Sequence, residues 1–277
     1  MKNFKSFISS YDTICPFCLN NHLDRVKNQF MNENAVEPKI DVRSMSILVP
    51  THGCVNACKF CVSKISQLKS EYDDLSKEEM FEEIYFKQFE RVSKMGCTYA
   101  ILTGTGEPIQ NKPFLSMIGR MNKRLENPFK LEIQTSGVML TQENLKFLKE
   151  EVGVYLISLS VSDIFNDTSN ADIITIRPRL RFNLKQLCHS IKDMGFILRI
   201  SLNLVNIYNN HTPEETMSRI LELGADQATF RVLWAGHDDN AISRWIKSNA
   251  VAQEYIDGPA NIRRLLVVMS FYLSIIM

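Results

Sequence analysis

The stretch CVNACKFC, residues 54–61, follows directly on the apolar run Ser46–Pro50. It places Cys54, Cys58 and Cys61 in the spacing C-x3-C-x2-C, and a loop this short brings three thiols toward one point. Thiolates are soft ligands that select iron–sulfur clusters, zinc or Cu(I). An iron–sulfur cube held by three cysteines keeps one iron open to an exogenous ligand, which implies chemistry as well as electron storage.

Length and composition are those of an ordinary soluble globular protein. The 277 residues suffice for one large domain, or for one domain with a small appendage. Apolar residues make up 45% of the chain and charged residues 23%, which is typical of a soluble protein. The 32 basic and 31 acidic residues give a formal charge of +1, and this balance argues against electrostatic binding of nucleic acid by the protein as a whole.

The two ends of the sequence bear on secretion and on membrane association. The N-terminus carries Lys2 and Lys5 but reaches the polar residues 9–12 before any apolar segment develops, so we expect no secretory signal. The expected compartment is therefore the cytoplasm, where seven cysteines, an odd number, favour metal binding over disulfides. Near the other end, Leu265–Met277 is almost wholly apolar, yet a membrane span needs about 20 residues. We expect a buried final element there and no association with a membrane.

Residues 1–42 are expected to form an N-terminal extension to a main domain of residues 43–277. The extension holds Cys15 and Cys18 in a C-P-x-C turn followed by His22, and the turn is similar to half of a zinc knuckle. A tetrahedral zinc site needs four ligands, of which this segment supplies at most three. Two interpretations stay open, a zinc site at Cys15 and Cys18 and a turn with two incidental cysteines.

Short β-branched runs alternate with helical patterns from residue 43 onward. Strands are expected at residues 45–50, 97–102, 130–134, 154–160, 197–205 and 228–233. Helices are expected at residues 76–95, 113–125, 141–150, 180–194, 213–223 and 242–255. Thr141 and Thr212 are expected N-caps, and Gly195 and Gly224 are expected to end helices. Six βα units predict an α/β fold with parallel strands and right-handed crossovers, whereas a closed barrel needs eight.

The loops that follow the strands are where a site is expected, because functional residues in βα architectures lie at the carboxyl ends of the strands. The loop after the second expected strand is TGTGEP, residues 103–108. Its two glycines allow a close approach of the backbone to a ligand. Taken alone, this loop is better explained as a glycine turn between strand and helix. Its position after a strand unit that ends in three cysteines favours a binding role.

The combination of these motifs is similar to that of the radical S-adenosylmethionine (SAM) superfamily. Phe60 fills the aromatic slot of the family pattern C-x3-C-x-aromatic-C. Gly106 and Glu107 match the family's Gly-Gly-Glu segment, with Thr105 in place of the first glycine. The resemblance covers roughly residues 44–235. It implies an open partial (βα)6 TIM-like barrel and a [4Fe-4S] cluster on the three cysteines, with SAM chelating the fourth iron.

The resemblance also implies which residues contact SAM. Backbone groups of the glycine segment are expected to hydrogen-bond the methionyl ammonium, and Glu107 adds a nearby carboxylate. A polar side chain at the end of the fourth strand is expected to hold the ribose; Ser160 aligns with that position, and Thr135 on the neighbouring strand is a second candidate. Asn203 must find a partner in backbone or cofactor, while serines and threonines at strand ends are also routine turn formers. The expected cofactor contacts are Phe60, Thr105, Gly106, Glu107, Thr135, Ser160 and Asn203.

The activity that the resemblance implies is radical SAM catalysis. One electron from a reduced cluster cleaves SAM to methionine and a 5′-deoxyadenosyl radical, which abstracts hydrogen from a substrate. A flavodoxin- or ferredoxin-type reductant is then required as a partner. The alternative is a non-catalytic metal-binding or electron-transfer protein that uses the cysteines structurally. The Gly106–Glu107 pair favours the enzyme, because a structural metal site has no need for it.

The substrate class is left open between a small anionic metabolite or nucleotide and a peptide. The loop after the fourth strand carries Arg177, Arg179 and Arg181 near an expected helix start. Cations there oppose the helix macrodipole, and arginine forks suit phosphate or carboxylate groups. The hypothesis is that one of these arginines meets an anionic substrate, against the alternative of a solvated loop or of ion pairs with local aspartates.

Overall fold

The computed structural model describes residues 42–64, 82–235, 239–257 and 272–275. These residues belong to one compact unit, Val42–Met277. The expected N-terminal extension lies outside the described residues, together with Cys15, Cys18 and His22. The zinc site and the domain boundary therefore stay predictions.

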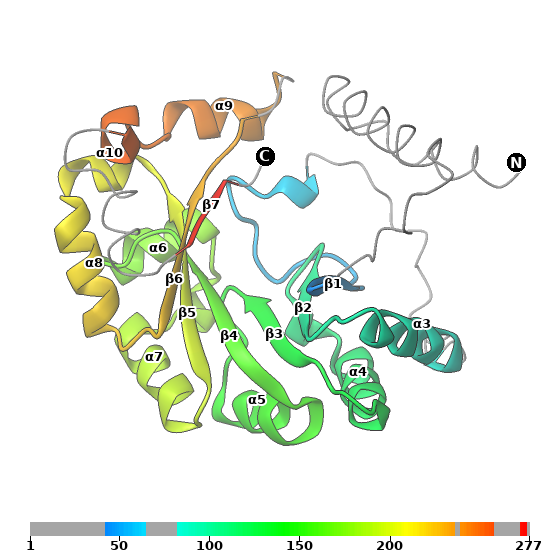
Figure 1. The fold of residues 1–277 in the computed structure, drawn as a ribbon. Helices are drawn as coiled ribbons and strands as arrows, with labels where there is room; N and C mark the ends of the chain where they lie inside the picture. Colours follow the sequence, from blue (N-terminus) through cyan, green and yellow to red (C-terminus); the bar gives the residue numbers. More distant parts are fainter. Residues whose placement is uncertain (1–41, 65–81, 236–238, 258–271, 276–277) are drawn as a thin grey trace, which may run out of the picture. The chain divides into compact units, whose positions relative to one another are not determined.

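The centre of the fold is a seven-stranded parallel sheet whose strands follow one another in chain order (Figure 1). The strands are β1 Ser44–Val49, β2 Tyr99–Gly104, β3 Lys130–Thr135, β4 Val154–Val161, β5 Ile197–Leu204, β6 Gln227–Val232 and β7 Tyr272–Ile275. Each pairs in parallel with the next, and among the described strands β1 and β7 form the two edges. The predicted α/β class and open partial barrel are confirmed.

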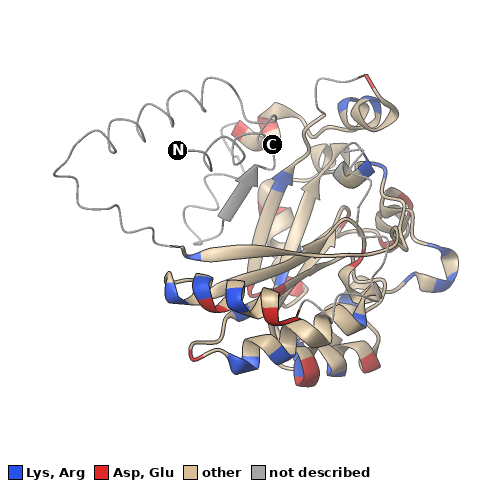
Figure 2. Ribbon diagram, turned by 90° about the vertical axis from the view of Figure 1, so that its right-hand side faces the viewer, with Lys and Arg blue, Asp and Glu red and all other residues tan. Residues whose placement is uncertain are grey.

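Helices connect and follow the strands of this sheet, and several of them cover its outer face. They are α3 Glu82–Lys94, α4 Lys112–Arg124, α5 Gln142–Phe147, α6 Asp167–Ile174, α7 Leu184–Asp193, α8 Pro213–Glu222, α9 Ala241–Ser248 and α10 Gln253–Asp257. Figure 1 shows α4, α5, α7 and α8 arranged around the sheet, and Figure 2 shows basic and acidic residues interspersed along the outer helices. Within the described part of the chain, no helix is both long enough and apolar enough to cross a membrane.

The two faces of the sheet differ in polarity because successive strand residues point to opposite sides. On β5, Leu198, Ile200 and Leu202 are fully buried in the core that also contains Leu187 and Ile191 of α7. The residues that alternate with them are polar. The strand order and register therefore form a polar inner face opposite the helix-covered outer face.

The structure differs from the sequence prediction in several elements. The stretch predicted as a polar loop after β4 contains α6, whose Asn166 side chain accepts a hydrogen bond from the Ser169 backbone N–H. The sequence of α6, DTSNADII, is mostly polar, and its short apolar side is too small to predict a helix. The predicted helix at residues 242–255 is divided into α9 and α10. A seventh strand, β7, lies within the apolar C-terminal run, where a short apolar segment gives no periodicity that separates strand from helix.

The helix ends agree more closely with the sequence. Thr141 accepts a hydrogen bond from Asn144 N at the start of α5, and Thr212 forms a reciprocal capping box with Glu215 at the start of α8. Gly195, directly after the last turn of α7, has the positive φ of +75° that favours glycine. These predicted caps are confirmed.

Replacing Thr212 by Ala removes the side-chain oxygen that accepts from Glu215 N at 3.1 Å. We expect a loss of about 1 kcal/mol in the free energy of unfolding, which lowers Tm by about 2–4 °C for a chain of this size. Thermal unfolding followed by circular dichroism measures the shift. Thr212→Ser keeps the cap and serves as the control; an equal loss in both variants contradicts the assignment.

Candidate functional site

The three cysteines of the first loop lie near one another at the carboxyl edge of the sheet. Cys54 is exposed, while Cys58 and Cys61 are partly buried, and all three are free thiols. Burial, reinforced by the neighbouring Cys61 and Cys54, raises the pKa of Cys58 to about 12. Burial also raises the pKa of Cys54, with the Glu107 carboxylate adding to the shift. At neutral pH the thiols of Cys54 and Cys58 therefore keep their protons until a cation displaces them.

The spacing of the thiols bears on which metal they suit. Among the described residues, no group of three or more His, Cys, Asp or Glu side chains is gathered closely enough to hold a single metal ion. Thiolates on one tetrahedral zinc ion stand about 3.8 Å apart, since each Zn–S bond is about 2.3 Å long. In an iron–sulfur cube each cysteine binds a different iron, so the ligands stand farther apart. The three thiolates are soft ligands of the kind that an iron–sulfur cluster requires.

Glu107, in the loop after β2, is the buried centre of a hydrogen-bond network. Its carboxylate accepts from Thr135 Oγ1 at 2.6 Å, from Ser136 Oγ at 2.7 Å and from Ser136 N at 3.0 Å. Burial raises the pKa of Glu107, and the hydrogen bonds from Ser136 and Thr135 oppose that shift. Glu107 and Thr135 thus hold the loops after β2 and β3 together.

The same network reaches the cysteine loop. Asn56, between Cys54 and Cys58, donates from Nδ2 to Ser136 Oγ at 2.8 Å. The neighbouring Val55 N donates to Gln110 Oε1 at 2.8 Å. The loops after β1, β2 and β3 are therefore joined by hydrogen bonds that start from the cysteine segment itself.

Gly106 is required by the approach of one loop to another. A Cβ at this position would lie 2.3 Å from Gly53 O and 2.4 Å from Thr51 Oγ1. Gly106 therefore permits the approach of the backbone before the cysteines, and the approach to a ligand expected from the sequence stays a prediction. Thr105 beside it is exposed.

Two later segments support the cysteine loop from its other sides. Lys59 N donates to Ile173 O of α6 at 3.2 Å, and Cys58 packs against the apolar cluster that includes Ile174. Phe60 contacts the ring of Trp245 in α9, with ring centroids 6.0 Å apart. The aromatic residue of the motif is thereby held by a helix far along the chain.

The remaining predicted contacts lie on the inner face of the sheet. Asn203 is buried and donates from Nδ2 to Ser162 Oγ at 3.3 Å. Ser160 accepts from Nη1 of Arg231 at 3.4 Å. Arg231 was not among the residues predicted from the sequence; it lies in β6, where Gln227 and Thr229 at alternate positions are also polar.

The arginine hypothesis rested on a helix start that the structure places elsewhere. Helix α7 begins at Leu184 with Asn183 as its N-cap, so the arginines do not oppose its macrodipole. Arg181 pairs with Asp172, with Nη2 2.6 Å from Oδ1. Arg177 and Arg179 are exposed, which favours the solvated-loop alternative.

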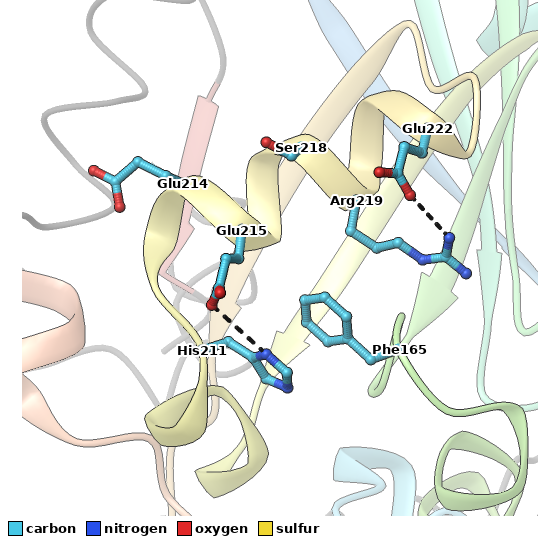
Figure 3. A pocket seen from close by; sticks show the side chains of 7 residues that line it. All are labelled: Phe165, His211, Glu214, Glu215, Ser218, Arg219 and Glu222. Carbon is cyan, nitrogen blue, oxygen red and sulfur yellow. Dashed lines mark hydrogen bonds and ion pairs between the residues drawn. The ribbon is translucent and has the colours of Figure 1, made fainter.

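A hollow of about 550 Å³ lies along α8 (Figure 3). The rings of Phe165 and His211 stack there with centroids 3.8 Å apart, and His211 Nδ1 lies 3.9 Å from Glu215 Oε2. None of the residues predicted for the site lines this hollow. The candidate site is therefore the loop cluster at the carboxyl ends of β1 to β3 with the adjoining inner face.

Comparison with known proteins gives a family and a fold. The sequence matches the family model described as "Radical SAM superfamily" over residues 48–220, more than half of the chain. A search of curated proteins found no match.

Solved structures share the fold at low sequence identity. Coproporphyrinogen III oxidase (HemN) from Escherichia coli, described as a radical SAM enzyme, is 16% identical with a TM-score of 0.50 over 82% of this chain and 51% of its own. Native anSMEcpe with bound AdoMet is 14% identical with a TM-score of 0.52 over 84% of this chain and 63% of its own. The complex of anSMEcpe with AdoMet and the Cp18Cys peptide is 17% identical with a TM-score of 0.50 over 68% and 50%. The chain thus spans about half the length of the first and third of these proteins.

Replacing Gly106 by Ala forces the loops after β1 and β2 apart, because the new Cβ would lie within 2.4 Å of two atoms of the first loop. We expect a strain of at least about 1–3 kcal/mol and the loss of most iron bound after anaerobic reconstitution. Iron and sulfide analysis measures the loss. Gly153→Ala, where a Cβ meets no atom within 4 Å but φ is +80°, is the control for a general loss of stability and is expected to keep its iron. Full iron content in Gly106→Ala contradicts the role of this contact.

Proposed function

The chain belongs to the radical SAM superfamily, and from that premise we propose that it is a radical SAM enzyme whose Cys54, Cys58 and Cys61 hold a [4Fe-4S] cluster. The chemistry supplied by such a cluster is one-electron cleavage of SAM to methionine and a 5′-deoxyadenosyl radical, which takes hydrogen from a substrate. The observation that carries the proposal is the link from Glu107 through Ser136 to Asn56. A structural metal loop does not require a buried carboxylate in the loop after the neighbouring strand.

The chain's own residues divide the work of binding and positioning. The cysteines supply the thiolates, and Glu107 and Thr135 fix the loops that surround them. Phe60, held against Trp245, presents an apolar ring beside the third cysteine. Contacts to SAM are proposed for the backbone at Thr105 and Gly106 and for the side chains of Glu107, Thr135, Ser160 and Asn203.

The partners follow from the chemistry. A flavodoxin- or ferredoxin-type protein is proposed as the electron donor, and the exposure of Cys54 supports access to the cluster from the surface. A cytoplasmic location is proposed because a reducing compartment preserves free thiols. The substrate is proposed to enter the polar inner face of the sheet.

The decisive measurement is the release of 5′-deoxyadenosine. Anaerobically reconstituted protein, reduced in the presence of SAM, is expected to form it, and Cys58→Ala is expected to form none because one of the three ligands is gone. Liquid chromatography with mass spectrometry measures the product. Cys188→Ala removes a buried thiol of α7 outside the cysteine loop and is expected to keep the activity.

The outcome that favours the alternative is equally specific. A wild-type protein that binds zinc and forms no 5′-deoxyadenosine is a non-catalytic metal-binding protein. Product in Cys58→Ala at the wild-type level would refute the ligand assignment.

A further inference from the structure

The inner face of the sheet contains one complete polar network. Glu132 of β3 is fully buried and accepts from Tyr99 Oη at 2.8 Å and from Arg199 Nη1 at 2.6 Å. Arg199 donates its other groups to Gln227 Oε1, from Nε at 2.9 Å and from Nη2 at 2.6 Å. The charge of Glu132 is therefore matched by Arg199.

Arg231 is a second cation on this face without such a partner. It is the penultimate residue of β6, and its hydrogen bond to Ser160 Oγ is long, at 3.4 Å. Within the described residues it forms no ion pair. Arg231 is partly buried; a guanidinium carries five N–H donors, and a charge partly removed from water is costly unless it is paired. Burial lowers the pKa of Arg231. The neighbouring Arg199 lowers the pKa further, whereas the negative charge of Glu132 raises it.

Ser201 adds an independent sign of a missing partner. Ser201 is completely buried, with 0% exposure. Its Oγ has no hydrogen-bond partner among the described residues. The register pairs Ser201 with Ser160 of β4 and with Thr229 of β6. Ser201 thus lies between Ser160 and the strand that carries Arg231.

The position of these groups separates them from the cofactor loops along the sheet. The loops joined through Glu107 follow β1, β2 and β3, whereas Arg231 lies on β6. Three strand spacings of about 4.8 Å place β6 about 14 Å from β3 along the sheet. Because all the strands run parallel, Arg231 and the loops joined through Glu107 lie toward the same, carboxyl ends of the strands. A ligand at Arg231 is therefore set apart from groups held by the first three loops.

We propose that Arg231, with the hydroxyl of Ser201, binds an oxyanion of the substrate, a carboxylate or a phosphate. The inference rests on the proposed function, since it names the substrate class of the same site. The guanidinium fork matches either anion with two parallel N–H···O bonds, and Ser201 supplies one O–H donor. This proposal places the anion site on the inner face of the sheet, and not at the exposed arginines of the loop after β4.

The test uses the reconstituted full chain, with inorganic phosphate and benzoate as probes in isothermal titration calorimetry. Wild type is expected to bind at least one probe saturably in the millimolar range, and Arg231→Gln to bind it about 10-fold or more weakly, as for loss of a charged hydrogen bond. Arg181→Gln, which removes a surface ion pair, is the matched control with wild-type affinity. Equal affinity in wild type and Arg231→Gln, or no binding by wild type, overturns the proposal.

SAM also carries a carboxylate, so its affinity is measured in the same variants. An unchanged affinity for SAM in Arg231→Gln is expected, and weaker binding of SAM with intact probe binding would assign Arg231 to the cofactor and overturn the proposal. Release of 5′-deoxyadenosine by wild type is scored separately, so failure of the anion site and failure of the radical SAM activity give different results.

A second variant separates binding from structure. Arg231→Met removes a partly buried cation that forms no ion pair within the described residues, so its Tm is expected to equal or exceed that of wild type. A fall in Tm would show that Arg231 is retained for stability, which contradicts the proposal.

Discussion

The buried carboxylate of Glu107 is the interaction on which the candidate site depends. It accepts hydrogen bonds from Thr135 and Ser136 at the end of β3, and Ser136 accepts in turn from Asn56 of the cysteine loop. A buried carboxylate is tolerated only where donors surround it, and each hydrogen bond to a charged group contributes about 1.5–3 kcal/mol. Displacing any of the three loops removes such bonds, so the loops keep their positions together.

Much of the fold follows from local features of the sequence. Six β-branched runs alternate with amphipathic helices, and this order alone predicts a parallel sheet, because parallel strands need a crossover between them. The cysteine spacing and the Gly106–Glu107 pair then mark which strand ends form the site. The links between them were beyond prediction, since Asn56, Gln110 and Ser136 are ordinary polar loop residues until the register brings them together.

The features that sequence analysis missed share a physical cause. Helix α6 is short and mostly polar, so the apolar residues on its side toward Cys58 are too few to show a helical period in the sequence. Arg231 sits in a strand, where a single basic residue does not reveal whether it faces solvent or the sheet interior. The arginines near residue 180 drew attention because they are clustered, yet their surroundings are a short 3-10 turn, Pro178–Leu180, and an ion pair with Asp172. A charged residue in a sequence can be assigned a binding role only when the opposite charges around it in the structure are known.

The supports of the cysteine loop have a consequence for the order in which the protein matures. The loop bonds to Ser136, Ile173 and, through Phe60, to the ring of Trp245, all of which leave the ribosome long after it. Chains emerge from the N-terminus at about 5–20 residues per second, so the thiols wait for roughly 180 further residues before their surroundings are complete. We therefore expect the loop to acquire its final shape only after residue 245 has been synthesised, and the proposed cluster to be assembled after that point.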